Sequence, residues 1–338
     1  MKRGFVYTTL FRQEDAMDKT YDVVALGELL IDFTETGNSP QGNPLLEVNP
    51  GGAPGNVLSM LQNYGEKTAF IGKVGEDMFG RILLDAVGSC GIDTSGIVVD
   101  KEVRTTLAFV HTYEDGDRDF SFYRNPGADM MLSKDEVNTD LIKNAKVFHF
   151  GTLSSTDPIV REATRYAIDV AKEAGAMISF DPNLREPLWK SLDDAKTEIA
   201  YGLGKCDLLK ISDNEVEFMC GTDDYDKGAQ MLIDQYHIPL ILITMGKAGS
   251  RAYYKGMRVE AQPFLNENTI ETTGAGDTFC ASSIHFALKY GLDNFTEERL
   301  KELLTYANAA ASIITTRKGA LRVMPKLDEV EALAKTRL

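Results

Sequence analysis

The sequence has few of the residues and patterns that metal sites, disulfide frameworks and membrane spans require. Its four cysteines, Cys90, Cys206, Cys220 and Cys280, form no CxxC pair and lie far apart, which argues against a zinc ribbon and a disulfide scaffold. Its four histidines form no HExxH pair. No apolar run approaches the roughly 18 residues that a membrane helix needs. We therefore expect reduced thiols, a cytoplasmic location and no membrane partner.

The chain also has fewer basic than acidic residues. The 338 residues include 36 Lys and Arg against 51 Asp and Glu, which gives a formal net charge of −15. Proteins that bind nucleic acid or anionic lipid use a basic surplus to neutralise phosphates, and this chain lacks one. We expect a small-molecule ligand and no nucleic acid. An anionic ligand would bind where arginines, lysines or helix N-terminal amides gather locally.

From Tyr21 onward, short apolar β-branched runs alternate with longer helical stretches. This alternation predicts an α/β fold with a mostly parallel sheet covered by helices on both faces. The expected strands are Asp22–Leu26, Thr68–Lys73, Val147–Phe150, Met177–Asp181, Leu208–Ile211 and Leu240–Met245. The expected helices are Asn56–Tyr64, Asp77–Ser89, Pro158–Ala174, Leu192–Leu203, Asn214–Cys220 and Asp226–Tyr236, followed by a mainly helical region after Gly274.

Two stretches interrupt this alternation. Extended residues at about 29–48 and 104–123 are joined by polar turns without an intervening helix. We expect them to form a small antiparallel sheet that pairs in space as a discontinuous lid on one domain spanning 21–338. Residues 1–20 precede the pattern and are expected to form a loose N-terminal extension.

The loop Gly274-Ala275-Gly276-Asp277 directly precedes a helical stretch. Glycines let backbone N–H groups approach an anion, and a helix N-terminus adds partial positive charge. The loop is not a dinucleotide fingerprint, because Phe279 stands where the third glycine would be, and the chain has no GxxxxGK[ST] loop. Taken alone, it is either an anion site or an ordinary turn.

Further candidate motifs occur along the chain, and each alone fits a structural role equally well. The run 51–56 (GGAPGN) offers exposed backbone and an amide side chain at Asn56. The run 181–185 (DPNLR) follows a predicted strand, where α/β sheets place ligand contacts. Asn214 and Glu217, and the glycines of 244–249 (TMGKAG), also follow predicted strands. Asp32 is an acid among apolar residues, which calls for a partner.

The order of these motifs resembles that of the ribokinase-like sugar kinases, also called the phosphofructokinase B family, from about Tyr21 to Leu327. The most specific elements are the run 51–56 and the run 272–277 (TTGAGD). Asn214-x-x-Glu217 and the glycines of 244–249 fall between them in family order. Within the family, the runs around Asp32, at 122–129 and at 181–189 look most like those of fructokinases.

This resemblance implies a three-layer α/β/α sandwich with a small β-sheet lid. It implies transfer of the γ-phosphoryl group of ATP, with Mg²⁺, to a hydroxyl of fructose to give fructose 6-phosphate. Asp277 would be the catalytic base, and the amides of Gly274, Ala275 and Gly276 would hold the transferring group. The sugar contacts would be Asp32, Gly51, Gly52, Asn56, Arg124 and Arg185.

The remaining implied roles concern the nucleotide and the metal ions. The nucleotide would contact Asn214, Thr244, Gly246, Gly249 and Asn308, and Glu217 would order magnesium through water. The family usually has an aspartate, linked to a monovalent-cation site, six residues before the base. Here that residue is Glu271, so Glu271 and Thr273 are the candidate ligands and activation by K⁺ stays open. Members of the family often dimerise through the lid, which composition does not test.

Three alternatives were weighed against fructose phosphorylation. A kinase for 2-keto-3-deoxygluconate would need to bind a carboxylate, which two arginines near the sugar site would allow. A non-catalytic sugar-binding regulator would keep the fold but has no need of Asp277 and its glycines. An NAD-dependent dehydrogenase conflicts with the late position of the Gly274-x-Gly276 loop and the missing βαβ context.

Overall fold

The computed structural model of the chain describes residues 19–112 and 118–338. The expected loose extension at 1–20 lies outside the described residues except for its last two positions, and residues 113–117 of the expected lid lie outside them too. Lys19 is anchored, because its Nζ donates hydrogen bonds of 2.8 Å to the carbonyl oxygens of Ala145 and Ala174. Lys19 therefore contacts the main body just before the first strand.

In the described residues, nine strands form one large sheet in the order β13-β12-β11-β10-β9-β8-β1-β4-β5. From β5 to β11 the neighbouring strands are parallel, and β12 and β13 add an antiparallel edge. The strands are β1 Tyr21–Leu26, β4 Thr68–Gly75, β5 Asp93–Asp100, β8 Ala145–Phe150, β9 Met177–Phe180, β10 Leu208–Ser212, β11 Leu240–Thr244, β12 Ser250–Tyr254 and β13 Met257–Ala261.

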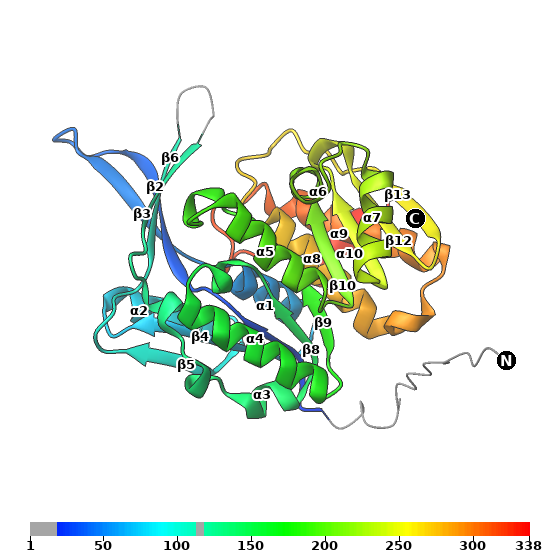
Figure 1. Cartoon of the computed structure of the whole chain (residues 1–338). Coiled ribbons are helices and arrows are strands. Elements are labelled where there is room, and N and C mark those ends of the chain that lie inside the picture. Colours follow the sequence, from blue (N-terminus) through cyan, green and yellow to red (C-terminus); the bar gives the residue numbers. More distant parts are fainter. Residues whose placement is uncertain (1–18, 113–117) are drawn as a thin grey trace.

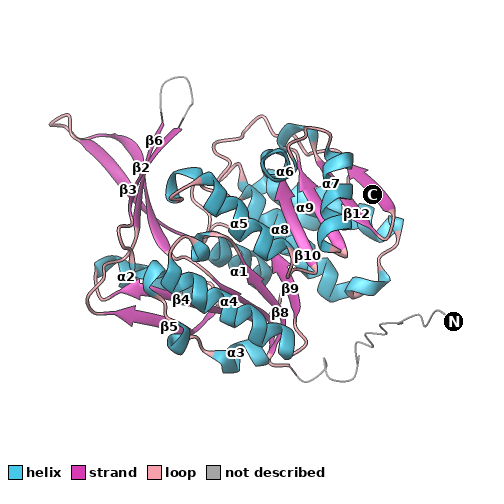
Figure 2. Ribbon diagram, viewed as in Figure 1, coloured by secondary structure: helices cyan, strands magenta, loops and turns pink. Residues whose placement is uncertain are grey.

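Helices cover both faces of this sheet (Figures 1 and 2). Along β1, Val23 and Ala25 pack on one face, with α1, α2, α8 and α9, whereas Val24 and Leu26 pack on the other, with α4. The helices are α1 Ala53–Asn63, α2 Met78–Ser89, α3 Thr139–Lys143, α4 Pro158–Glu173, α5 Leu192–Leu203, α6 Asp213–Cys220, α7 Tyr225–Tyr236, α8 Ala275–Tyr290, α9 Glu297–Ile314 and α10 Leu327–Ala334. The expected three-layer α/β/α sandwich is confirmed.

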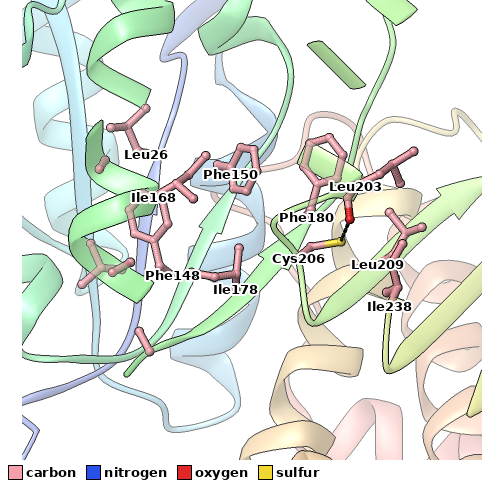
Figure 3. Close-up of a cluster of buried hydrophobic side chains, with 14 of the residues drawn as sticks. Leu26, Phe148, Phe150, Ile168, Ile178, Phe180, Leu203, Cys206, Leu209 and Ile238 are labelled. Atoms are coloured by element: carbon pink, nitrogen blue, oxygen red, sulfur yellow. Dashed lines mark hydrogen bonds between the residues drawn. The ribbon is translucent and has the colours of Figure 1, made fainter. Parts of the chain in front are cut away.

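Buried aromatic rings join the central strands to the helices on one face (Figure 3). Phe150 of β8 stacks on Phe180 of β9 with ring centroids 4.7 Å apart, and both side chains are buried. Gly202 of α5 lies against the Phe180 ring, where a Cβ would come within 2.4 Å of it. Such close packing fixes the carboxyl ends of the parallel strands, where loops begin.

A second sheet of four strands, in the order β3-β2-β6-β7, projects from the main body and is called the lid below (Figure 1). Its strands are β2 Leu30–Asn38, β3 Pro44–Gly51, β6 Leu107–Thr112 and β7 Arg118–Tyr123. β2–β3 and β6–β7 are antiparallel pairs, but β2 and β6 run parallel. The lid is therefore antiparallel within each hairpin, as expected, and parallel where the two hairpins, which come from separate parts of the chain, meet side by side.

All the strands and helices expected by range are present, with boundaries that shift by at most three residues. Helix α1 begins at Ala53, three residues before the expected start, because Pro54 suits the first turn of a helix. Strands β5, β12 and β13 were not expected. β5 and β13 form the two edges of the sheet and are only partly buried, which leaves a weaker apolar pattern, and β12 lies next to the β13 edge. No described helix is long and apolar enough to cross a membrane.

Arg124, which follows the lid strand β7, is a buried structural residue. Its guanidinium donates to Asp129 at 2.8 Å, to the Thr156 hydroxyl at 2.7 Å and to the Leu153 carbonyl at 2.9 Å. The arginine is 7% exposed and the aspartate 4%. The hydrogen bonds to Leu153 and Thr156 thus fasten the base of the lid to the segment after β8.

Removing the charge of Arg124 should destabilise the fold. We expect Arg124→Met to lower the free energy of unfolding by about 3–5 kcal/mol, because the buried carboxylate of Asp129 would lose its charged partner. Arg251→Met is the matched control, since Arg251 pairs with Glu260 near the surface and should cost about 1 kcal/mol or less. Urea unfolding measures both, and equal losses in the two variants would contradict a structural role for Arg124.

Candidate active site

A cleft of about 780 Å³ lies at the carboxyl ends of the parallel strands, beneath the lid. Its walls come from the lid, from the segments after β1, β9, β10 and β11, and from the starts of α1 and α8. Of the expected site residues, those that line it are Asp32, Gly51, Gly52, Asn56, Arg185, Asn214, Thr244, Glu271, Thr273, Gly274, Gly276 and Asp277. Topology thus brings together residues that are up to 245 positions apart (277 − 32).

Two helices begin at this cleft without a side-chain cap, α1 after Gly52 and α8 after Gly274. By contrast α2, α4, α5, α6, α7 and α9 each have a capping Asp, Ser or Thr. Gly52 and Gly274 have φ values of 128° and 79°, a region that favours glycine. At α8 the first-turn N–H groups of Gly276 and Asp277 form a site for an anion, whereas the Ala53 N–H of α1 already donates to Glu28.

Asp277 lies in the first turn of α8, and Asn56 of α1 holds its carboxyl. The Asn56 Nδ2 donates to Asp277 Oδ2 at 2.8 Å, and both residues are buried. Burial raises the pKa of Asp277, while the Asn56 hydrogen bond and the nearby Lys210 and Arg185 oppose that rise. The Asn56 Oδ1 is buried without a hydrogen-bond partner in the described residues. A fixed carboxyl beside an unused acceptor suits a ligand with hydroxyl groups.

Asp32 of β2 lies against Gly51, where a Cβ would come within 2.7 Å of the carboxylate. Burial raises the pKa of Asp32 to about 7, Arg185 opposes this, and Glu271 and Asp277 add to it. Arg185 is exposed to the cleft. Gly51 therefore makes room for the Asp32 carboxyl, which lines the same cleft as Asp277. Arg124, in its buried ion pair, does not line the cleft.

Three charged residues near Asp277 were given no role of their own from the sequence. Glu28 follows β1 and accepts from the Ala53 N–H at 2.9 Å, and burial raises its pKa to about 7. Lys210 of β10 and Asp181 after β9 form a buried ion pair. A lysine inside the apolar run 208–211 was the available signal, since a buried cation needs a partner.

The expected nucleotide residues divide into two groups. Asn214 and Thr244 line the cleft. Gly246, Gly249 and Asn308 do not. Gly246 and Gly249 shape the turn between β11 and β12, and the Asn308 amide donates at 3.3 Å to the carbonyls of Ala261 and Gln262. Asn308 thus ties α9 to the segment after β13.

The expected magnesium residue, Glu217, is not brought to the cleft. It is exposed on α6, with its Oε1 3.5 Å from the Tyr225 hydroxyl. Glu215 is buried on the cleft wall instead, and it accepts from the N–H groups of Ser212 and Leu184 at 2.8 Å. Ser212 caps α6, so the third helical residue, Glu215, points back towards the cap. Sequence alone could not place this boundary.

The expected monovalent-cation residues both line the cleft, and Glu271 Oε1 accepts from the Gly319 N–H at 2.8 Å. Within residues 19–112 and 118–338, no group of three or more His, Cys, Asp or Glu side chains is arranged to hold a metal ion. The four cysteines are all described and unpaired.

Solved structures share this architecture over nearly the whole chain. A fructokinase from Xylella fastidiosa with bound ATP matches with a TM-score of 0.84 and 30% identity, over 94% of this chain and 98% of its own. A fructokinase from Vibrio cholerae O395 in a fructose-, ADP- and calcium-bound form matches with a TM-score of 0.83 and 28% identity, over 93% and 99% of the two chains.

Sequence comparison points the same way. Probable fructokinase-2 from Arabidopsis thaliana is 42% identical over 314 residues, covering 92% of this chain and 94% of its own. Fructokinase-1 from Zea mays is 41% identical over 310 residues, covering 91% and 96%. The model of the pfkB family carbohydrate kinases matches residues 20–327. This chain belongs to the pfkB family of carbohydrate kinases.

Proposed function

We propose that this enzyme transfers the γ-phosphoryl group of ATP to a hydroxyl of fructose, giving fructose 6-phosphate and ADP. The relatives named above are fructokinases at about 42% identity, and the structural neighbours are fructokinases with ATP, or with fructose and ADP. A phosphotransferase acting on an alcohol group also fits the chemistry of the cleft.

The buried pair of Asn56 and Asp277 at the start of α8 carries this proposal. As the hydroxyl oxygen of the sugar bonds to the γ-phosphorus, its proton passes to the Asp277 carboxylate. The bond from phosphorus to the bridging oxygen breaks, and ADP leaves with that electron pair. The open N–H groups around Gly274 and Gly276 stabilise charge on the transferring group. The Ala275 N–H, which donates to the Thr272 carbonyl, contributes less.

The charge of the cleft favours a neutral sugar over a keto acid. Of its described lining residues, eight are acidic and three are basic: Glu28, Asp32, Glu35, Glu47, Glu186, Glu215, Glu271 and Asp277 against Arg185, Lys210 and Lys318. With Arg124 committed to Asp129, Arg185 is the arginine left near Asp32 for a carboxylate. A fructose hydroxyl can instead donate to Asp32, whereas a carboxylate there would be repelled.

The metal ions belong to the same proposal. Mg²⁺ neutralises phosphate oxygens and needs few protein ligands. Glu215, as a buried carboxylate on the cleft wall, is the residue that fits this role. Asn214 and Thr244 lie nearby on the cleft wall as nucleotide contacts. Glu271 and Thr273 offer oxygen atoms for a monovalent cation such as K⁺.

We also propose that the lid pairs with the lid of a second chain. Its edge strand β3 has exposed apolar side chains at Leu45, Leu46 and Val48, which are 48%, 42% and 37% exposed. Unpaired strand edges with apolar residues readily join another sheet.

The four free thiols fit a reducing compartment such as the cytoplasm.

Loss of the Asp277 carboxylate should abolish turnover. We expect Asp277→Asn to lower kcat about 10²–10⁴-fold, the usual contribution of a general base, with little change in ATP binding. ADP release from MgATP is followed with fructose, 2-keto-3-deoxygluconate and ribose in parallel. A loss of less than about tenfold would contradict the role of Asp277, and turnover of the keto acid in place of fructose would contradict the substrate.

Glu215 and Glu217 provide a matched pair on one helix. We expect Glu215→Gln to raise the magnesium concentration needed for half-maximal rate by about 10–100-fold, because it removes a carboxylate from the cleft. Glu217→Gln, on the exposed face, should leave the magnesium titration unchanged. The opposite pattern would return the metal role to Glu217.

Leu46 tests the lid interface. We expect the wild-type protein to have the mass of two chains by light scattering, and Leu46→Glu to convert it to one chain, because a charge cannot be buried unpaired at an apolar interface. Leu265→Glu, at a position that is 71% exposed outside the lid, is the control and should remain a dimer. A wild-type monomer at micromolar concentration would contradict the proposal.

A further inference from the structure

We propose that Lys210 is a further catalytic residue, whose ammonium stabilises the charge of the transferring phosphoryl group beside the Gly276 N–H, and that Asp181 is the positioning residue that holds it there. The inference rests on the proposed function, since it adds a residue to the phosphoryl-transfer step.

The geometry places the ammonium at the expected anion site. Lys210 lies on β10 and is 6% exposed, and its Nζ is 3.1 Å from both carboxylate oxygens of Asp181. A Cβ built on Gly276 would lie 3.1 Å from the same Nζ. Lys210, Gly276 and Asp277 all line the cleft. The ammonium and the open first turn of α8 therefore face the same point.

The hydrogen bonds of Lys210 leave room for a ligand. An ammonium has three donors, and Asp181 is its hydrogen-bond partner among the described residues. Asp181 follows β9 and is 4% exposed, so it holds the Lys210 ammonium from the buried side. At least one N–H is left for an anion on the cleft side. A purely structural ion pair would have no need to border the cleft.

Lys210 is also the buried cation of this cleft. The other two described basic lining residues, Arg185 and Lys318, are exposed. A charge that is held in place and shielded from water interacts more strongly with a developing anion than an exposed one. During transfer, negative charge spreads over the peripheral oxygens of the phosphoryl group, and the ammonium needs no proton exchange to offset it.

The Lys210 ammonium also affects the pKa of Asp277, the proposed base. Burial raises the pKa of Asp277, and the Asn56 hydrogen bond, the Lys210 ammonium and Arg185 oppose that rise. The carboxyls of Asp32 and Asp181 interact unfavourably with the Asp277 carboxylate. On the far side, burial and the Lys210 charge lower the pKa of His149 to about 3, so this neighbour adds no positive charge. Lys210 thus favours the ionised form of Asp277 that accepts the sugar proton.

Lys210→Met tests the inference, because methionine keeps the length of the side chain and removes its charge. We expect kcat to fall about 10²–10³-fold, as for loss of one oxyanion donor, with the KM for fructose unchanged. We also expect the acid limb of the pH profile of kcat/KM to move to higher pH, because Asp277 loses a cation that favours its ionised form. Lys205→Met, which breaks an exposed ion pair with Asp169, is the control and should behave as wild type.

A double variant separates catalysis from folding. Lys210→Met with Asp181→Asn leaves no unpaired buried charge, so it should recover the thermal stability lost by Lys210→Met alone. We expect it to stay as slow as the single variant. Recovery of kcat in the double variant would reduce Lys210 to a structural role, and so would a loss of less than about threefold in the single variant with an unmoved acid limb.

The wild-type enzyme and Asp277→Asn are assayed alongside. Absence of fructose-dependent ADP release by the wild type overturns the fructose assignment. The comparison of Lys210 variants is then made on the sugar that the wild type phosphorylates, where the same two results decide it.

Discussion

The hydrogen bond between Asn56 and Asp277 is the contact on which the cleft depends, because it joins the starts of two helices that belong to opposite ends of the chain. Both helices begin after a glycine with positive φ and lack a side-chain cap. A capping side chain at either place would fill the space and satisfy the amides that a ligand needs. The absence of a capping side chain at Gly52 and Gly274 therefore leaves open space where the two helix starts meet.

The carboxyl groups around that contact have raised pKa values, and one buried lysine lies among them. Burial raises the pKa values of Glu28, Asp32 and Asp181 to about 7 and also raises that of Asp277. Lys210, fixed by Asp181, offsets the excess of acid where phosphate would lie. The acidic end under the lid is left for a neutral polyol, whose hydroxyls can donate to carboxyl oxygens. One cleft can thus receive an anionic phosphate and a neutral sugar side by side.

Sequence reasoning found the features whose signal is local. The alternation of strands with helices predicted the sandwich. The glycine-rich runs around Gly52 and Gly274 indicated both ends of the cleft. Features that depend on the exact start of a helix, or on a partner residue far away in the sequence, could not be predicted. The cap at Ser212 turns Glu215 of α6 towards the cleft in place of Glu217. Arg124 is fixed by Leu153 and Thr156, which lie about 30 residues further along the chain. Lys210 is the one charged residue of β10, and its partner Asp181 comes from the segment after β9.

A crystal structure with fructose and a non-hydrolysable ATP analogue would test the central claim most directly. If Asp277 is the base, one sugar hydroxyl should lie within about 2.6–3.2 Å of its carboxylate. The γ-phosphate should rest on the first turn of α8, beside the Lys210 ammonium. A sugar bound with no hydroxyl near Asp277, or a γ-phosphate remote from Gly276, would contradict it.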